Sequence, residues 1–145
     1  MDKYSFIDEL HQYCINNSVV FVLGSSYYTS ADLADGLEQS KLVLVTDCVP
    51  LPTFGRNNAS VQSVTYTGRI LLGRKSELTT MATLDENMLQ KYYNRLKELW
   101  ELLELHLTTF ACANKLNVVV TQSYQLTNFL AENVDFVGYD VKIEV

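Results

Sequence analysis

The sequence predicts a single α+β domain over residues 1–145, in which a mostly antiparallel sheet of four to five strands packs against an N-terminal helix and one long helix laid across it. Its 145 residues are the usual size of one domain, and apolar residues make up 48% of them, which is enough for a packed core. Segments with the twofold period of strands alternate with segments that have the 3.6-residue period of helices. The expected order is helix, strand, short helix, two strands, long helix and two strands.

The N-terminal part opens with a predicted helix over residues 5–16. Its apolar residues recur at three- and four-residue steps, and they are Phe6, Ile7, Leu10, Tyr13 and Cys14. The short β-branched run Val19–Leu23 predicts a buried strand that ends at Gly24. Residues 25–40 are polar and mixed, and Ser30 is placed to cap a short helix there.

A long hairpin with a projecting tip is predicted for about residues 41–72. Its first strand, over residues 41–49, is expected to end at Pro50 and Pro52, because proline cannot donate a hydrogen bond to a ladder. Glycine and asparagine in residues 55–58 then favour a turn.

The second strand of this hairpin is predicted for residues 61–72, where apolar and polar side chains alternate. Gly68 interrupts the apolar row. A glycine at such a position indicates a bulge or a close approach of two backbones.

A long helix over about residues 84–114 is the clearest feature of the sequence. Thr83 and Glu86 have the spacing of a capping box, in which the hydroxyl and the carboxylate each bind a free backbone N–H. No proline or glycine follows before Asn114. At 1.5 Å per residue the helix would be roughly 45 Å long.

Two further strands are predicted after the helix. The first covers residues 118–126, and a helical turn is expected over residues 127–133. Residues 137–145 have a clean period of two, which predicts a paired strand.

The long helix has more apolar surface than one sheet contact requires. One stripe consists of Leu89, Tyr92, Leu96, Leu99, Leu103, Leu107 and Phe110. A second set widens it to half of the circumference, and this set is Tyr93, Trp100, Leu102 and Leu105. Either the small helices cover the second face or a neighbouring subunit does, and we favour the subunit because so short a chain has few elements to spare.

Charges on the long helix are segregated along its axis. The bases Lys91, Arg95 and Lys97 precede the acids Glu98, Glu101 and Glu104, which opposes the order favoured by the helix dipole. A solvated charged face explains this order, and so does a head-to-tail contact between identical subunits. The residues predicted for a subunit interface are Tyr93, Arg95, Lys97, Trp100, Glu101 and Glu104.

No motif for catalysis, metal binding or cofactor binding is found, so we expect no enzyme, no metal and no cofactor. His11 and His106 each lie alone in a predicted helix, without a ligand or base partner at a recognisable spacing. Nucleophile-elbow and phosphate-loop patterns are absent. The acids Asp32, Asp35 and Glu38 are three residues apart, which is typical of a solvated helix face.

The charge balance excludes a general nucleic-acid binder. Seventeen acids against eleven bases give a net charge of −6, which repels a phosphate backbone. A basic group around the hairpin is therefore assigned to salt bridges between subunits in preference to DNA contact, and its members are Arg56, Arg69, Arg74 and Lys75.

Compartment signals are sparse. The N-terminal residues show no basic stretch followed by an apolar run, so we expect no signal peptide, and no apolar run approaches the roughly 20 residues of a membrane span. The three cysteines lack paired spacings, which predicts three free core thiols in a reducing cytoplasm. They are Cys14, Cys48 and Cys112.

The order of these elements resembles that of the tail-completion and tail-terminator proteins of tailed bacteriophages and of related head-to-tail ring (neck) proteins. The corresponding segments are the helix from Phe6 to Cys14, the hairpin 41–72, the helix that Thr83-Leu84-Asp85-Glu86 opens, and the closing strand 136–145. The resemblance is one of topology, and it carries no motif from which a functional residue could be transferred.

This resemblance implies a structural protein of the virion, assembled in the host cytoplasm, which acts by self-assembly into a ring of six or twelve and by docking to other neck or tail proteins. The ring would contact DNA only as the DNA passes through the channel of the ring, and no membrane is involved. A loop that reaches the next ring is predicted at Pro52, Phe54, Arg56 and Asn57.

Two other functions remain open at this point. The first is a cytoplasmic adaptor or inhibitor that binds another protein through an acidic surface. The second, which is less favoured, is an enzyme with a pocket near His11, His106 or the acids Asp32 and Asp35.

Overall fold

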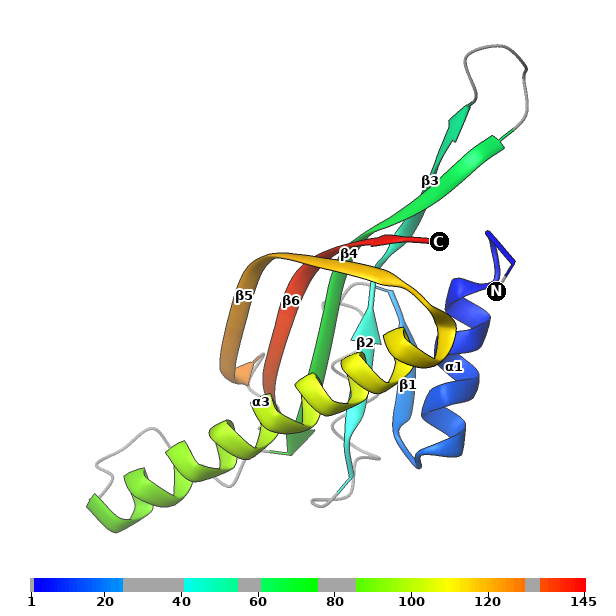
Figure 1. Cartoon of the computed structure of the whole chain (residues 1–145). Helices are drawn as coiled ribbons and strands as arrows, with labels where there is room; N and C mark the ends of the chain where they lie inside the picture. Colours follow the sequence, from blue (N-terminus) through cyan, green and yellow to red (C-terminus); the bar gives the residue numbers. More distant parts are fainter. Residues whose placement is uncertain (1, 25–40, 55–60, 76–85, 130–133) are drawn as a thin grey trace.

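The computed structural model describes residues 2–24, 41–54, 61–75, 86–129 and 134–145. It shows an α+β fold in which two helices accompany a six-stranded sheet (Figure 1). The elements are α1 (Phe6–Asn16), β1 (Val20–Leu23), β2 (Val43–Thr46), β3 (Val49–Phe54), β4 (Val61–Lys75), α3 (Glu86–Asn114), β5 (Asn117–Phe129) and β6 (Val134–Glu144).

The sheet is mixed and slightly larger than predicted. Its strand order is β1-β2-β4-β6-β5, and β3 pairs with β4 beside this path. All pairs are antiparallel except β1 with β2. The predicted count of four to five strands was too low, because Val49–Phe54 forms a strand of its own.

The prediction that Pro50 and Pro52 end a strand was wrong, because both lie inside β3. They stand opposite Tyr66 and Val64 of β4. Within the described residues β3 pairs only with β4, so it is an edge strand, where a missing N–H can face solvent without loss of a ladder bond.

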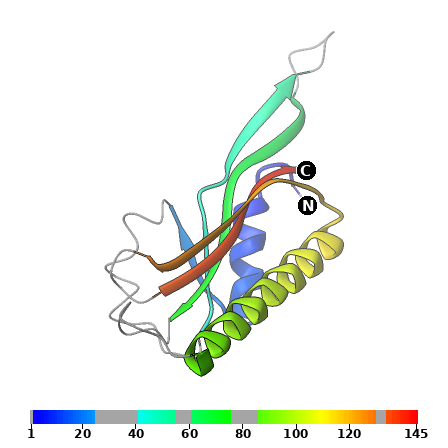
Figure 2. The ribbon, with the colours of Figure 1, turned by 90° about the vertical axis from the view of Figure 1, so that its left-hand side faces the viewer.

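The β3–β4 hairpin projects from the body of the molecule, as predicted (Figures 1 and 2). We call the described part of this projection, Val49–Phe54 with the paired residues 61–67, the arm. The predicted turn over 55–58 lies outside the described residues, as do Arg56 and Asn57.

A bend between β2 and β3 sets the arm off from the sheet. The Asp47 carboxylate accepts a hydrogen bond from the Arg69 backbone N–H at 2.6 Å and forms two 3.2 Å bonds with the Arg69 guanidinium. Gly68, opposite this bend, has φ +152°, and a Cβ there would lie 2.7 Å from the Cys48 Cα. The close backbone approach predicted at Gly68 is therefore confirmed.

Both helices pack on one face of the sheet (Figure 2). The main core joins α1, α3 and the sheet, and its largest side chains are Phe6, Tyr66, Ile70, Leu72, Leu99, Leu103, Phe110 and Ile143. A second cluster of buried residues consists of Val43, Val45, Leu71, Val134 and Phe136. These belong to β2, β4 and β6, so the sheet is apolar on its other face as well.

Other boundaries differ from the prediction in detail. β5 continues to Phe129, so the helical turn expected from residue 127 is wrong as far as Phe129. The predicted short helix within 25–40 and the cap at Thr83 lie outside the described residues. α3 ends at Asn114 as expected, and Lys115 follows with φ +54°, a left-handed conformation that commonly ends helices.

Neither helix that the structure describes has the length and apolarity needed to cross a bilayer.

Candidate interaction surface

α3 buries most of the apolar stripe that the sequence predicts, except that Leu89 is 37% exposed and Leu107 is half-buried, and it leaves part of its second apolar set exposed. Leu96, Leu99 and Leu103 are at most 4% exposed. Tyr93 and Leu105 lie on sides of the helix away from this buried stripe, and they are 55% and 59% exposed. The described part of the chain therefore covers one face of α3 and leaves large apolar side chains outside it.

Trp100, one of the predicted interface residues, already makes contacts within its own chain. Its ring lies 5.5 Å from that of Tyr139, centroid to centroid, and its indole N–H donates to the Gln125 side-chain oxygen at 3.2 Å. These contacts tie α3 to β5 and β6. Trp100 is half-buried, so only part of its surface is available to a partner.

The exposed charges on α3 are mixed in sign. Lys97 lies 3.9 Å from Glu101 in an exposed ion pair, which contributes a few tenths of a kcal/mol. Glu98 instead accepts a 3.1 Å hydrogen bond from Arg74 of β4, which also donates to the Arg95 carbonyl at 2.8 Å.

Two members of the basic group around the hairpin, Arg69 and Arg74, are paired with acids of their own chain. Arg74 is only 8% exposed and fastens β4 to α3. Arg69 is held by Asp47 at the bend. Both cations pair with an acid of the same chain, because the antiparallel strands bring Asp47 to Arg69 and the packing of α3 brings Glu98 to Arg74. Sequence spacing does not reveal either pair. Arg56 lies outside the described residues, and Lys75 is half-buried at the end of β4.

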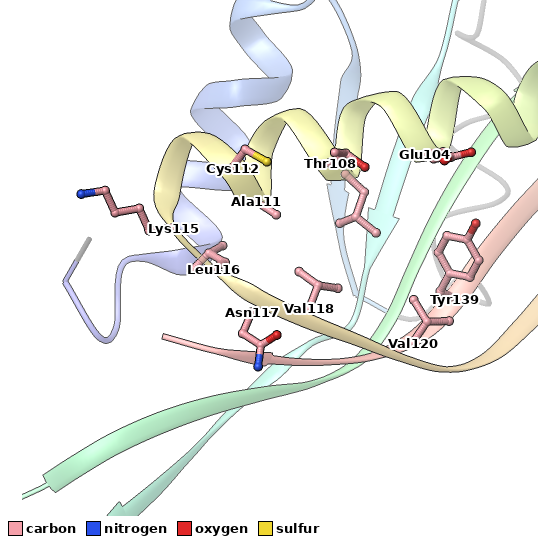
Figure 3. A pocket seen from close by; sticks show the side chains of 11 residues that line it. Glu104, Thr108, Ala111, Cys112, Lys115, Leu116, Asn117, Val118, Val120 and Tyr139 are labelled. Carbon is pink, nitrogen blue, oxygen red and sulfur yellow. The ribbon is translucent and has the colours of Figure 1, made fainter.

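A groove of about 780 Å³ lies between the C-terminal half of α3 and strand β5 (Figure 3). Its walls are mainly apolar, and they consist of Leu107, Ala111, Leu116, Val118, Val120 and Tyr139. Glu104, Thr108, Cys112, Lys115 and Asn117 add polar groups to the lining. A shallower hollow adjoins it along α3 and is lined by Glu101, Glu104, Leu105 and Thr108.

Two groups in this groove have notable electrostatics. Glu104 makes no ion pair or side-chain hydrogen bond within the part of the chain that the structure describes. Burial raises the pKa of Tyr139, and the Glu104 charge raises it further. Glu104 is therefore an uncompensated negative charge beside an apolar surface, available to a cation from outside.

Cys112 corrects the prediction of three core thiols. Cys14 and Cys48 are buried, and burial raises the pKa of each to about 11. Cys112 is exposed on α3 and lines the groove. Its position on the helix surface follows from the helix phase, which places it outside the buried stripe.

The arm carries a second exposed apolar surface. All six residues of β3 are exposed, and Val49, Leu51 and Phe54 are 53%, 51% and 61% exposed. Pro52 and Phe54, predicted for a loop that reaches the next ring, are strand residues of this arm. At the base of the arm, Leu51 and Pro52 line a hollow of about 410 Å³ that extends to Val119 of β5.

The polar residues at the arm base are structural. Beside the Asp47–Arg69 pair, the Tyr124 hydroxyl donates a hydrogen bond to the Asp140 carboxylate across β5 and β6. This hydrogen bond raises the pKa of Tyr124, with smaller contributions from burial and nearby charges. The arrangement cross-links neighbouring strands on one face of the sheet.

The two histidines form ordinary aromatic contacts. The Tyr13 hydroxyl lies 2.8 Å from Nδ1 of His106, and burial lowers the pKa of His106. His11 stacks on Phe21 at 4.8 Å between ring centroids. Among the described residues no group of three or more His, Cys, Asp or Glu is placed to hold a metal ion, and Asp32, Asp35 and Glu38 lie outside these residues.

No known protein-family model matches the chain, and no curated protein sequence matches it significantly. The bacteriophage resemblance therefore stays a prediction. What the structure itself provides is a pair of exposed apolar surfaces, the groove beside α3 and the arm.

Proposed function

We propose that this chain is a structural subunit of a virion, which assembles with identical copies into a ring at the head–tail junction or the tail end of a bacteriophage. The ring would contain six or twelve copies and would dock to neighbouring neck or tail proteins. In this role the chain acts through its shape and its contacts with other subunits, and it catalyses no reaction.

The observation that carries this proposal is the exposed apolar surface on α3 and beside it. Tyr93 and Leu105 are more than half exposed at separate places on α3, and the hollow beside Leu105 adjoins the groove, which extends to Val118 and Val120 of β5. Isolated exposed apolar residues are normal, but an apolar groove next to exposed large side chains is typical of a surface that another protein covers.

Charge supports identical copies as the partner. The flank of α3 that faces outward carries both signs, with Lys97 before Glu101 and Glu104. A surface of mixed sign can meet a second copy of itself without net repulsion, whereas a purely acidic face could not.

The proposal is tested by the mass of the purified protein, measured by light scattering over a wide concentration range. We expect a discrete closed oligomer, seen as rings in electron micrographs, that adds to purified virion parts. A particle that stays monomeric at every concentration and does not add to those parts would contradict the proposal.

The second candidate, an acidic adaptor or inhibitor, is favoured by the net charge of −6 and by the uncompensated Glu104. Affinity capture at low and high salt separates the two functions. An adaptor would retain one host protein in a salt-sensitive manner, and a ring subunit would retain virion proteins and copies of itself.

A further inference from the structure

The arm and the groove have matching chemistry, yet no residue of the arm lines the groove of its own chain. The arm extends away from the body, past the start of β5 (Figures 1 and 3). Its apolar side chains Val49, Leu51 and Phe54 stay more than half exposed there. Two exposed apolar surfaces that cannot meet within one chain can meet between two chains.

We propose that the groove between α3 and β5 receives the arm of a second copy of this chain. Leu51 and Phe54 of one copy pack against Leu107, Val118 and Val120 of the next. This inference rests on the proposed function, since it requires self-association, and it deepens it by naming the two surfaces that meet.

The charge distribution favours the arm over other occupants. The described residues of the arm, 49–54 and 61–67, contain no charged side chain, so none would be forced into the apolar groove. In the sequence from Val49 to Gly68 the only charged residue is Arg56, which is positive. The groove itself carries one charge of each sign, Glu104 and Lys115, so an uncharged occupant meets no net repulsion there.

The prolines of β3 determine how the arm can bind. Pro50 and Pro52 have no N–H, so the outer edge of β3 cannot continue a regular ladder with the free edge of β5. The arm therefore docks through side chains that fill a groove, and not by adding a strand to the sheet.

Such a contact is heterologous. Each copy supplies one arm and one groove at different places on its surface, so the assembly closes into a ring or continues as an open chain. A six-residue strand covers less area than a standard interface of about 800 Å² per partner, so each contact is weak alone and the closed assembly is stabilised by many of them.

Cross-linking between two differently labelled chains tests the inference directly, because Cys112 already lies in the groove. The donor chain carries Phe54→Cys and Cys112→Ser, and the acceptor is the wild-type chain. The two are mixed when dilute, concentrated, and treated with a short bismaleimide. Cys14 and Cys48 are buried with raised pKa values and stay unmodified.

We expect a donor–acceptor product that is lost when the acceptor also carries Cys112→Ser. The matched control is a donor with Ile15→Cys and Cys112→Ser, since Ile15 is exposed to a similar fraction, 57%, but lies on α1 away from both surfaces. That donor should give no product above background. Equal product from both donors would overturn the inference.

A second measurement uses association. Phe54→Asp should lower the association constant at least about tenfold, the loss expected when one aromatic anchor is replaced by a charge, while Ile15→Asp leaves it unchanged. If the wild-type protein never associates, the proposed function fails and this inference with it. If the wild type assembles and Phe54→Asp assembles equally well, this inference alone is overturned.

Discussion

Leu103 and Leu105 are the same residue type two positions apart on α3, and the structure assigns them opposite roles. Leu103 is fully buried between the sheet and α1, whereas Leu105 is 59% exposed. Replacing each by alanine removes the same atoms and keeps a residue of high helix propensity. The pair therefore separates the contribution of folding from that of assembly.

For Leu103→Ala we expect the free energy of unfolding to fall by about 2–5 kcal/mol, because a buried leucine loses its contacts and leaves a cavity. For Leu105→Ala the change should stay within about 0.5 kcal/mol, as for an exposed position. Urea unfolding followed by circular dichroism, at concentrations where the protein is monomeric, measures both values.

Self-association should show the reverse order. Leu105→Asp places a charge on the exposed flank of α3 beside Glu101 and Glu104, so we expect the oligomer to dissociate at concentrations where the wild type is assembled. Sedimentation velocity measures the distribution of monomer and oligomer directly. If Leu105→Ala destabilised the monomer as much as Leu103→Ala, the orientation of α3 would be refuted. If Leu105→Asp left the mass distribution unchanged, the outer flank of α3 would not belong to the interface.

Three further predictions concern packing, pH and thiol chemistry. Gly138→Ala should lower the free energy of unfolding by about 1–3 kcal/mol in urea titrations, because its Cβ would overlap the Leu71 Cδ2 and lie 2.6 Å from the Ile70 carbonyl oxygen, which the backbone cannot easily move. Burial lowers the pKa of His106 in the folded state, so the unfolded chain binds a proton on this histidine more readily. The free energy of unfolding should therefore fall as the pH drops below 6.5. His106→Gln should remove this part of the pH dependence of the free energy of unfolding. In the native protein a maleimide should modify Cys112 alone, as measured by mass spectrometry, and unfolding should add the two buried thiols, Cys14 and Cys48.

Local periodicity was sufficient to predict the elements whose packing is regular. The stripe through Leu99 and Leu103 predicted the buried face of α3, and the alternation over 137–145 predicted β6. These features depend only on which side of a helix or strand faces the core. The sequence pattern records that choice at every residue.

Features that depend on strand order were not predictable in this way. Whether β3 can contain Pro50 and Pro52 depends on its being an edge strand, which is set by residues far away in the chain. Arg69 pairs with Asp47 because of how neighbouring strands are aligned, and Arg74 pairs with Glu98 because of where α3 lies on the sheet. The groove likewise depends on how α3 and β5 are placed side by side in the fold, so neither its residues nor the exposure of Cys112 could be assigned beforehand.

β3 and β5, two of the edge strands that the structure describes, differ in how they are protected, and this difference bears on the kind of assembly. Over 117–129, β5 contains neither proline nor a charged residue, and its protection consists of two register shifts. β3 contains two prolines, so edge pairing between β3 and β5 of different copies is blocked on the β3 side. Heterologous association through side chains in a groove can close into a ring, whereas repeated strand addition builds a continuous sheet, as in fibres. The prolines of β3 therefore fit the proposed closed assembly, because they block strand addition at the β3 edge and leave the apolar side chains of the arm exposed.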